Sequence, residues 1–311
     1  MDRLPTEIWE SIFQHACTDG GPTGRSLSLV SKRARDLSSP SKYYTLVLHA
    51  RQDGFASFLR FLNSGMYSIE RQPVHHLLFS VGTYDLVCII LFDAFSRKHP
   101  ARGYCHDSNT IDNAIHILSL LSPGLHSLTL IQLSTIVFQL LSSIQDNMVF
   151  PHLTHLTIIA NNPDDLYRIC SLQDRRHDGP VAFPRVHTAK LHFGGAMFKE
   201  LFHALVSSAP SLQVLRIAQP KIIRTSDLLI ALRLFYGIGE QRRKHDAEPA
   251  HRVVVEVETI RELGVGGLSW LHERTALEQI AARDERLRIK PQSPSRSAEA
   301  LVRQWLDGEP C

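Results

Sequence analysis

Few residues in this chain match the residue types and spacing of a known catalytic motif. Cys105, His106 and Asp107 supply a nucleophile, a base and an acid in one short stretch. Catalytic triads are assembled from separate parts of a fold, so adjacent residues rarely reach triad geometry. The chain contains neither Gly-x-Ser-x-Gly nor His-Glu-x-x-His. We therefore expect a protein that is not an enzyme. An undetected hydrolase stays open as an alternative, because one sequence does not reveal shifted ionisable groups.

The residues that could hold a ligand or metal also favour structural roles. His75 and His76 fall on an expected strand, where their rings should face opposite sides and share a metal ion poorly. Asp164 and Asp165 begin an expected helix, where acidic residues favour the helix dipole. The glycine-rich residues 264–267 lack a following Gly-Lys-Ser, so we expect a turn rather than a phosphate loop. We predict no cofactor and no metal site.

Composition narrows the class of partner and the compartment. A formal net charge of +3 over 311 residues is too small to suggest binding to nucleic acid. The five cysteines form no CxxC pair, which favours a reducing compartment. No signal peptide is visible at Met1, and the most apolar segment, residues 86–95, is too short to span a bilayer. We predict a cytoplasmic or nuclear protein with no membrane partner.

The N-terminal segment is expected to form two short helices. Pro5 fits the first turn of a helix, where its missing N–H has no intrahelical partner. Apolar residues recur at helical spacing up to Ala16, and the turn formers of residues 17–24 end that helix. A second helix is expected over residues 26–37. Because two such helices are too short to bury their own apolar surface, we expect a partner protein to complete them.

Three short motifs stand out in this segment: Leu4-Pro5-x-Glu7-Ile8, Ile12-Phe13 and Leu27-x-Leu29-Val30-Ser31-Lys32-Arg33. With these residues the segment resembles the F-box, the helical module that docks substrate receptors on the Skp adaptor of Skp–cullin–F-box ubiquitin ligases. The resemblance looks closest to fungal F-box proteins, although residues 18–25 are rich in glycine where many F-boxes have an aspartate-led helix start. The resemblance implies that the adaptor-facing residues are Leu4, Pro5, Ile8, Ile12, Leu27, Val30 and Ser31. An N-terminal hairpin that only caps the following domain is the alternative.

A repeat follows, in which apolar residues stand two, five and seven positions after a proline. The four clear copies begin at Pro123, Pro151, Pro184 and Pro210, and weaker copies surround Tyr43 and Pro73. Within each copy the last two apolar positions differ by two, which indicates a strand with one buried face. Runs at helical spacing lie between copies, so each unit is predicted to be a strand plus a helix that stacks on its neighbours.

This pattern looks like an irregular leucine-rich repeat array of about six units, with a parallel sheet. An ordinary α/β domain is the alternative. We therefore expect an α/β protein in which F-box helices (residues 1–40) precede a solenoid of alternating strands and helices (41–260). A C-terminal cap (261–289) and a flexible tail (290–311) would follow, with a last strand near residues 252–257.

The predicted function is that of a substrate receptor. The N-terminal helices would dock on the Skp adaptor, and through it on a cullin, while the array binds a target protein that the sequence does not identify. The alternative is a non-catalytic interaction scaffold unconnected to ubiquitin, with the hairpin as its cap.

Overall fold

The computed structural model describes the chain in two compact units. Unit 1 comprises Met1–Ile131 with Arg296–Cys311, and unit 2 comprises Gln132–Ser295. Across both units the architecture is mixed α/β with parallel strands. The described residues are 4–17, 22–49, 54–65, 73–80, 108–131, 148–160, 181–193, 205, 208–218, 253–259 and 275–291.

Unit 1 begins with three short helices where the sequence predicts two. The expected helix over residues 26–37 is wrong, because the chain breaks at Ser31 into α2 and α3. Ser31 is extended (φ −162°, ψ 163°), and its Oγ accepts a hydrogen bond from the Ala34 N–H at 3.0 Å, which makes it the N-cap of α3. The helices are α1 (Thr6–Ala16), α2 (Pro22–Val30) and α3 (Lys32–Ser38), followed by the 3-10 turn η1 (Ser39–Ser41).

Helix α2 starts inside the glycine-rich stretch that was expected to be a connector. Gly24 lies within it because the helix passes close to the backbone at Lys42: a Cβ on Gly24 would lie 3.1 Å from the Lys42 Cα. Arg35 Nε donates to the Ser28 carbonyl at 2.9 Å and so satisfies one of the last carbonyls of α2. Phe13, Cys17 and Ala34 form the small buried core of these helices.

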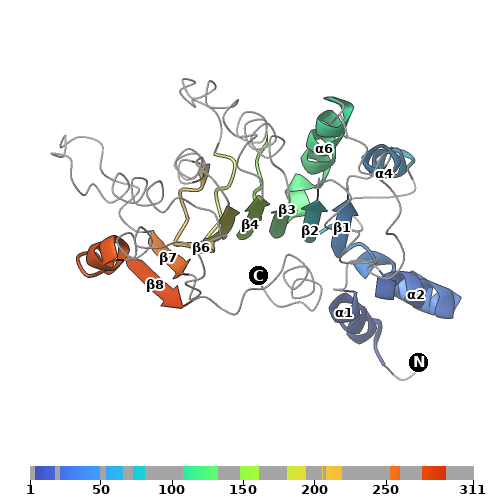
Figure 1. Ribbon diagram of the computed structural model, residues 1–311. Coiled ribbons are helices and arrows are strands. Elements are labelled where there is room, and N and C mark those ends of the chain that lie inside the picture. The colour runs from blue at the N-terminus through green and yellow to red at the C-terminus, as the bar shows by residue number, and fades with distance from the viewer. Residues whose placement is uncertain are drawn as a thin grey trace, which may run out of the picture. The chain divides into compact units, whose positions relative to one another are not determined.

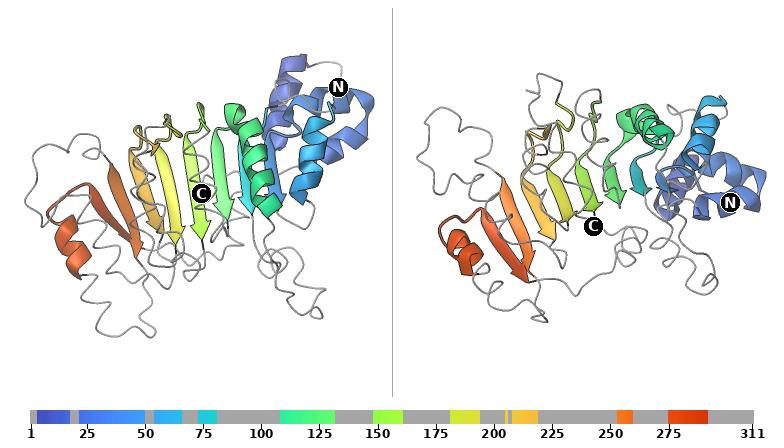
Figure 2. Two further views of the ribbon diagram at one scale, coloured as in Figure 1. Left: turned by 90° about the horizontal axis from the view of Figure 1, so that it is seen from above. Right: turned by 45° about the horizontal axis from the view of Figure 1, so that its top comes forward.

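The described residues in the rest of unit 1 include a three-stranded parallel sheet and two helices. Strands β1 (Thr45–His49), β2 (His76–Ser80) and β3 (Ser127–Ile131) pair in that order. Helices α4 (Gly54–Asn63) and α6 (Ser108–Leu121) lie on one side of these strands (Figures 1 and 2), as their apolar spacing predicts. The Phe55 ring of α4 stacks on the Phe79 ring of β2 with centroids 4.5 Å apart. The 3-10 turn η2 (Ser122–Gly124) joins α6 to the approach to β3.

The described residues of unit 2 form five parallel strands that pair in chain order. They are β4 (His155–Ala160), β5 (Thr188–Phe193), β6 (Val214–Ala218), β7 (Val254–Thr259) and β8 (Leu287–Pro291). Strand β7 confirms the strand predicted near residues 252–257, but the prediction that it is the last strand is wrong, because β8 follows it and pairs with it. A helical segment, residues 275–281, precedes β8 and buries Leu277 and Ile280.

The proline-led repeat forms strands with one buried face, as its spacing predicts. Each of the four clear copies contributes one strand, and its apolar positions two, five and seven are all buried at 3% exposure or less. Strand alternation places the last two of these on one face of the sheet. The three buried apolar residues of each copy, in chain order, are Leu125, Leu128, Leu130; Leu153, Leu156, Ile158; Val186, Ala189, Leu191; and Leu212, Leu215, Ile217.

His75 and His76, whose rings were expected to face opposite sides of a strand, both lie near Tyr44. Their ring centroids are 4.7 and 5.1 Å from that of Tyr44. The expected strand does not contain both histidines, because β2 begins at His76 and His75 precedes it. The His75 ring also lies 4.8 Å from that of His126.

Several predicted features lie outside the described residues. They are the Cys105–Asp107 stretch, Asp164 and Asp165, the apolar segment 86–95 and the glycine-rich residues 264–267.

Candidate protein-binding surface

The most exposed apolar side chains gather in the N-terminal helices. Among the described residues, five of the seven exposed large hydrophobic side chains fall between positions 4 and 30. The other two are Val149 and Val181 in unit 2. The five are Leu4 (45% exposed), Ile8 (47%), Ile12 (44%), Leu29 (77%) and Val30 (66%). We call these five the N-terminal apolar surface.

Helix α1 has apolar side chains on two sides. Ile8 and Ile12 are spaced by four residues within α1, which aligns them along one stripe, and Leu4 precedes the helix. Another stripe carries Trp9 and Phe13, whose rings stack at 5.6 Å, and Phe13 is buried against the neighbouring helices. Burial of the second stripe holds α1 in place, so the first stripe is left facing outward.

The chain before α1 fixes where this helix starts. The Pro5 carbonyl accepts hydrogen bonds from the N–H groups of Ile8 (3.2 Å) and Trp9 (3.4 Å). Pro5 is extended (φ −55°, ψ 150°), so it stands just before the first turn rather than inside it. Leu4 is thereby held beside the start of the exposed stripe.

The C-terminal end of α2 adds the two most exposed members, Leu29 and Val30. They are exposed here because Ser31 breaks the helix immediately afterwards, so no further turn covers them. Ser31 itself is exposed, although its hydroxyl accepts the Ala34 N–H. Ser31 therefore has a local structural role in addition to any role at a surface.

The seven sequence-predicted residues divide by exposure. Leu4, Pro5, Ile8, Ile12, Val30 and Ser31 are exposed, whereas Leu27 is half-buried. Leu29, which is 77% exposed, is the member of the N-terminal apolar surface that was not among the predicted adaptor-facing residues.

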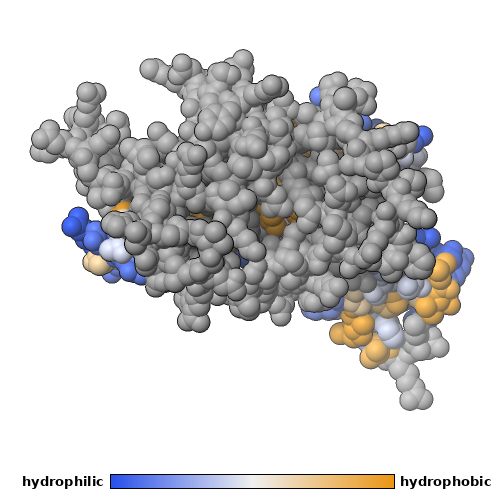
Figure 3. Space-filling view, in the orientation of Figure 1, coloured by the Kyte–Doolittle hydropathy of each residue, from blue (hydrophilic) through white to orange (hydrophobic). Residues whose placement is uncertain are grey.

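Figure 3 shows apolar side chains gathered over the N-terminal helices, at the lower right of the view. Charged and exposed neighbours surround them, including Glu7 and Glu10 on α1 and Lys32 and Arg33 on α3. Exposed apolar side chains that gather on one module and are bordered by polar residues are typical of a protein-interaction site. The side chains of this surface are aliphatic, so a partner that covers it would gain free energy from their burial.

Other classes of site find no support in the described ranges. Within residues 4–291, gaps excepted, no group of three or more His, Cys, Asp or Glu side chains could hold a metal ion. In the same part of the chain, no helix is both long and apolar enough to cross a bilayer. No protein-family model, no curated protein and no solved structure matches this chain. Function is therefore inferred from the sequence pattern and the exposed side chains.

Proposed function

We propose that this chain is the substrate-recognition subunit of a Skp–cullin–F-box ubiquitin ligase. The N-terminal apolar surface docks on the Skp adaptor, and the strands that follow display a surface to a target protein. The chain supplies no chemistry of its own. It acts as a tether, because holding a target beside a ubiquitin-charged enzyme raises the effective concentration to roughly millimolar.

The observation that carries the proposal is the exposure of Leu4, Ile8 and Val30. Had the hairpin only sealed its own domain, these side chains would lie inside the molecule, yet they are 45%, 47% and 66% exposed. A large aliphatic side chain gains about 1.5–3 kcal/mol on full burial, so burying the exposed part of each should contribute about 1–2 kcal/mol to docking.

The strands support the second half of the proposal. Three parallel strands in unit 1 and five in unit 2 each pair in chain order, and four of them follow the same proline-led register. Sequential parallel strands from repeated units are typical of solenoids, which present an extended surface to partners. We assign target binding to this array.

The test is co-purification with the Skp adaptor. Ile8→Asp places a carboxylate in the apolar stripe and should abolish co-purification, because docking would bury that charge without a partner. Val181→Asp is the matched control, since Val181 is 43% exposed but lies in unit 2. The proposal fails if Ile8→Asp and Val181→Asp recover the adaptor at the same yield.

One observation favours the alternative of a scaffold with a hairpin cap. Gly24 approaches the Lys42 backbone closely, so α2 packs against the chain that leads into β1. Deletion of residues 1–40 separates the two functions. Loss of a cap should lower the melting temperature of the remaining chain sharply, whereas loss of a docking module should leave it largely unchanged and remove only adaptor binding.

A further inference from the structure

A row of charged side chains crosses the sheet of unit 2 on the face opposite its apolar residues. In β7, Val255 and Val257 are fully buried on the apolar face, so Glu256 and Glu258 point to the other face. The pairing register aligns Glu256 with Arg216 of β6 and with Arg288 of β8. We define the basic row as Lys190, Arg216, Arg288 and Lys290, contributed by β5, β6 and β8.

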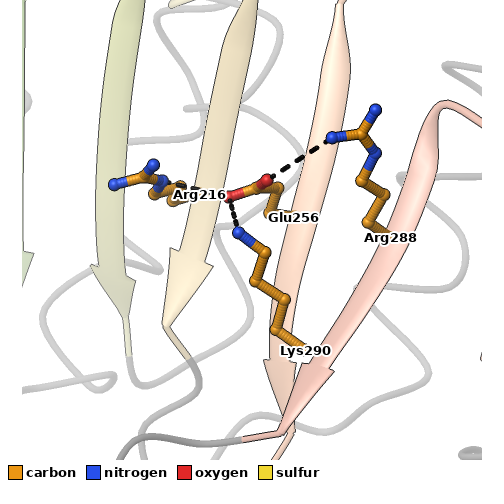
Figure 4. Close-up of polar contacts among 4 residues, drawn as sticks. All are labelled: Arg216, Glu256, Arg288 and Lys290. Carbon is orange, nitrogen blue, oxygen red and sulfur yellow. Dashed lines mark hydrogen bonds and ion pairs between the residues drawn. The ribbon is translucent and has the colours of Figure 1, made fainter.

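Glu256 organises three of these four cations (Figure 4). Its Oε2 accepts hydrogen bonds from Arg216 Nε at 3.0 Å and Lys290 Nζ at 2.8 Å, and its Oε1 lies 4.0 Å from Arg288 Nη1. The Glu256 side chain is only 7% exposed, whereas those of Arg216, Lys290 and Arg288 are 43%, 48% and 60% exposed. The carboxylate therefore lies beneath cations that still face solvent.

The face keeps an excess of positive charge after this pairing. The four cations of the basic row and the carboxylates of Glu256 and Glu258 give these six side chains a formal charge of +2. His155 of β4 shares this environment: burial lowers its pKa, and the charges of His187 and Arg216 lower it further. Cations held in place by a buried partner lose less conformational entropy when an anion binds.

We propose that the basic row binds an extended acidic segment of a partner protein. If the chain is a substrate receptor, this inference names the chemistry of its target. Binding of the acidic segment requires only unit 2, so its test is independent of the test of adaptor docking.

The spacing of the row fits a short extended peptide. Adjacent strands lie about 4.8 Å apart, so the three strand steps from Lys190 to Arg288 cover about 14 Å. An extended chain advances about 3.3 Å per residue, so about five residues span the row. Alternate side chains of such a peptide point the same way, and three acidic residues at every second position meet the cations.

A peptide suits this surface better than a nucleic acid. The Glu256 and Glu258 carboxylates interrupt the cations and would repel a continuous phosphate backbone. The row contains no aromatic side chain on which a base could stack. The carboxylates of a flexible peptide are separate from one another, so they can contact the cations without lying beside Glu256 or Glu258.

The test uses the full chain and a fluorescein-labelled peptide of twelve residues with glutamate at alternate positions. Fluorescence anisotropy at low ionic strength should show saturable binding that weakens as salt is added. Replacing Lys190 and Arg288 together by alanine should weaken binding about tenfold, since each exposed charge pair contributes up to about fivefold. The charge-reversed pair Lys190→Glu and Arg288→Glu should show no detectable binding.

Arg283→Glu is the matched control, because Arg283 is an exposed cation of unit 2 outside the basic row and should leave peptide affinity unchanged. Circular dichroism checks that each variant is folded, and the milder alanine pair decides the result if the reversed pair is not. Three outcomes overturn the proposal: no binding by the wild-type chain, equal loss in the Arg283→Glu control, or tighter binding of a single-stranded oligonucleotide of equal charge.

Discussion

Replacing Glu256 by glutamine should loosen β8 while leaving the rest of unit 2 in place. The substitution keeps the shape of the side chain but removes the charge that Arg216 and Lys290 contact at 3.0 and 2.8 Å. A hydrogen bond to a charged group contributes about 1.5–3 kcal/mol when buried, but both partners here are about half-exposed, which reduces the contribution to about 1 kcal/mol each. Glutamine retains one acceptor, so we expect a loss of about 1–2 kcal/mol, or a factor of about 5–30 in local opening.

Native-state hydrogen exchange measures this opening amide by amide. Protection should fall in β8, which carries Lys290 and Arg288, and should change little in β4 and β5. Glu258→Gln is the matched control, because it removes the same charge from the same face of β7 without touching the contacts of Glu256 with Arg216, Arg288 and Lys290. Equal loss of β8 protection in both variants, or none in Glu256→Gln, would refute the assignment of Glu256 as the anchor of β8.

Two further predictions follow from single contacts. Ser31→Ala removes the acceptor for the Ala34 N–H and should cost about 1 kcal/mol, whereas Ser31→Asp, which also caps, should cost much less; thermal unfolding of unit 1 compares the two. Acid should weaken the attachment of β8. Burial alone would raise the pKa of Glu256, but hydrogen bonds and charge from Lys290 and then Arg216 outweigh it and lower the pKa below its ordinary value. The hydrogen bonds of Arg286 likewise lower the pKa of Asp284. The stabilisation that the ionised carboxylates contribute is fully present above about pH 4.3, and it is lost as the pH falls through their lower, folded-state pKa. Hydrogen exchange at falling pH should show that loss in the wild type and less of it in Glu256→Gln, and an identical pH profile for the two would contradict the reasoning.

The repeat was predictable because its signal is local and periodic. Leu128 and Leu130, or Leu215 and Ile217, alternate with polar residues at a fixed distance from a proline, and each pair is fully buried. Two-residue alternation specifies a strand face without reference to the rest of the chain. The helical spacing in α4 and α6 works in the same way with a different period.

Features that depend on a single residue were less predictable. Ser31 lies in an apolar run that continues a helical pattern on both sides, and a serine can either stay inside a helix or cap a new one. The competition is decided by packing, including the approach of Gly24 to Lys42, which no local pattern reveals. The break changes the candidate surface, because it exposes Leu29 and Val30 at the end of α2.

Strand β8 was missed for another reason. Leu287 occupies the buried position that pairs with Val255, but Ala282 stands where the repeat would have its proline. Asp284 instead accepts the Arg286 N–H at 3.0 Å and shapes the entry to the strand. The Glu256 contacts were hidden as well, since residues 216, 256 and 288 become neighbours only once the strand register is known.

The central claim is that the N-terminal apolar surface docks on the Skp adaptor, and a calorimetric titration of the purified chain with that adaptor tests it most directly. We expect the chain to bind one adaptor saturably, with a negative heat-capacity change because apolar side chains are buried. Ile8→Asp should abolish the signal, while Val181→Asp should preserve it. The claim is contradicted if the wild-type chain gives no binding, or if Ile8→Asp binds with wild-type affinity.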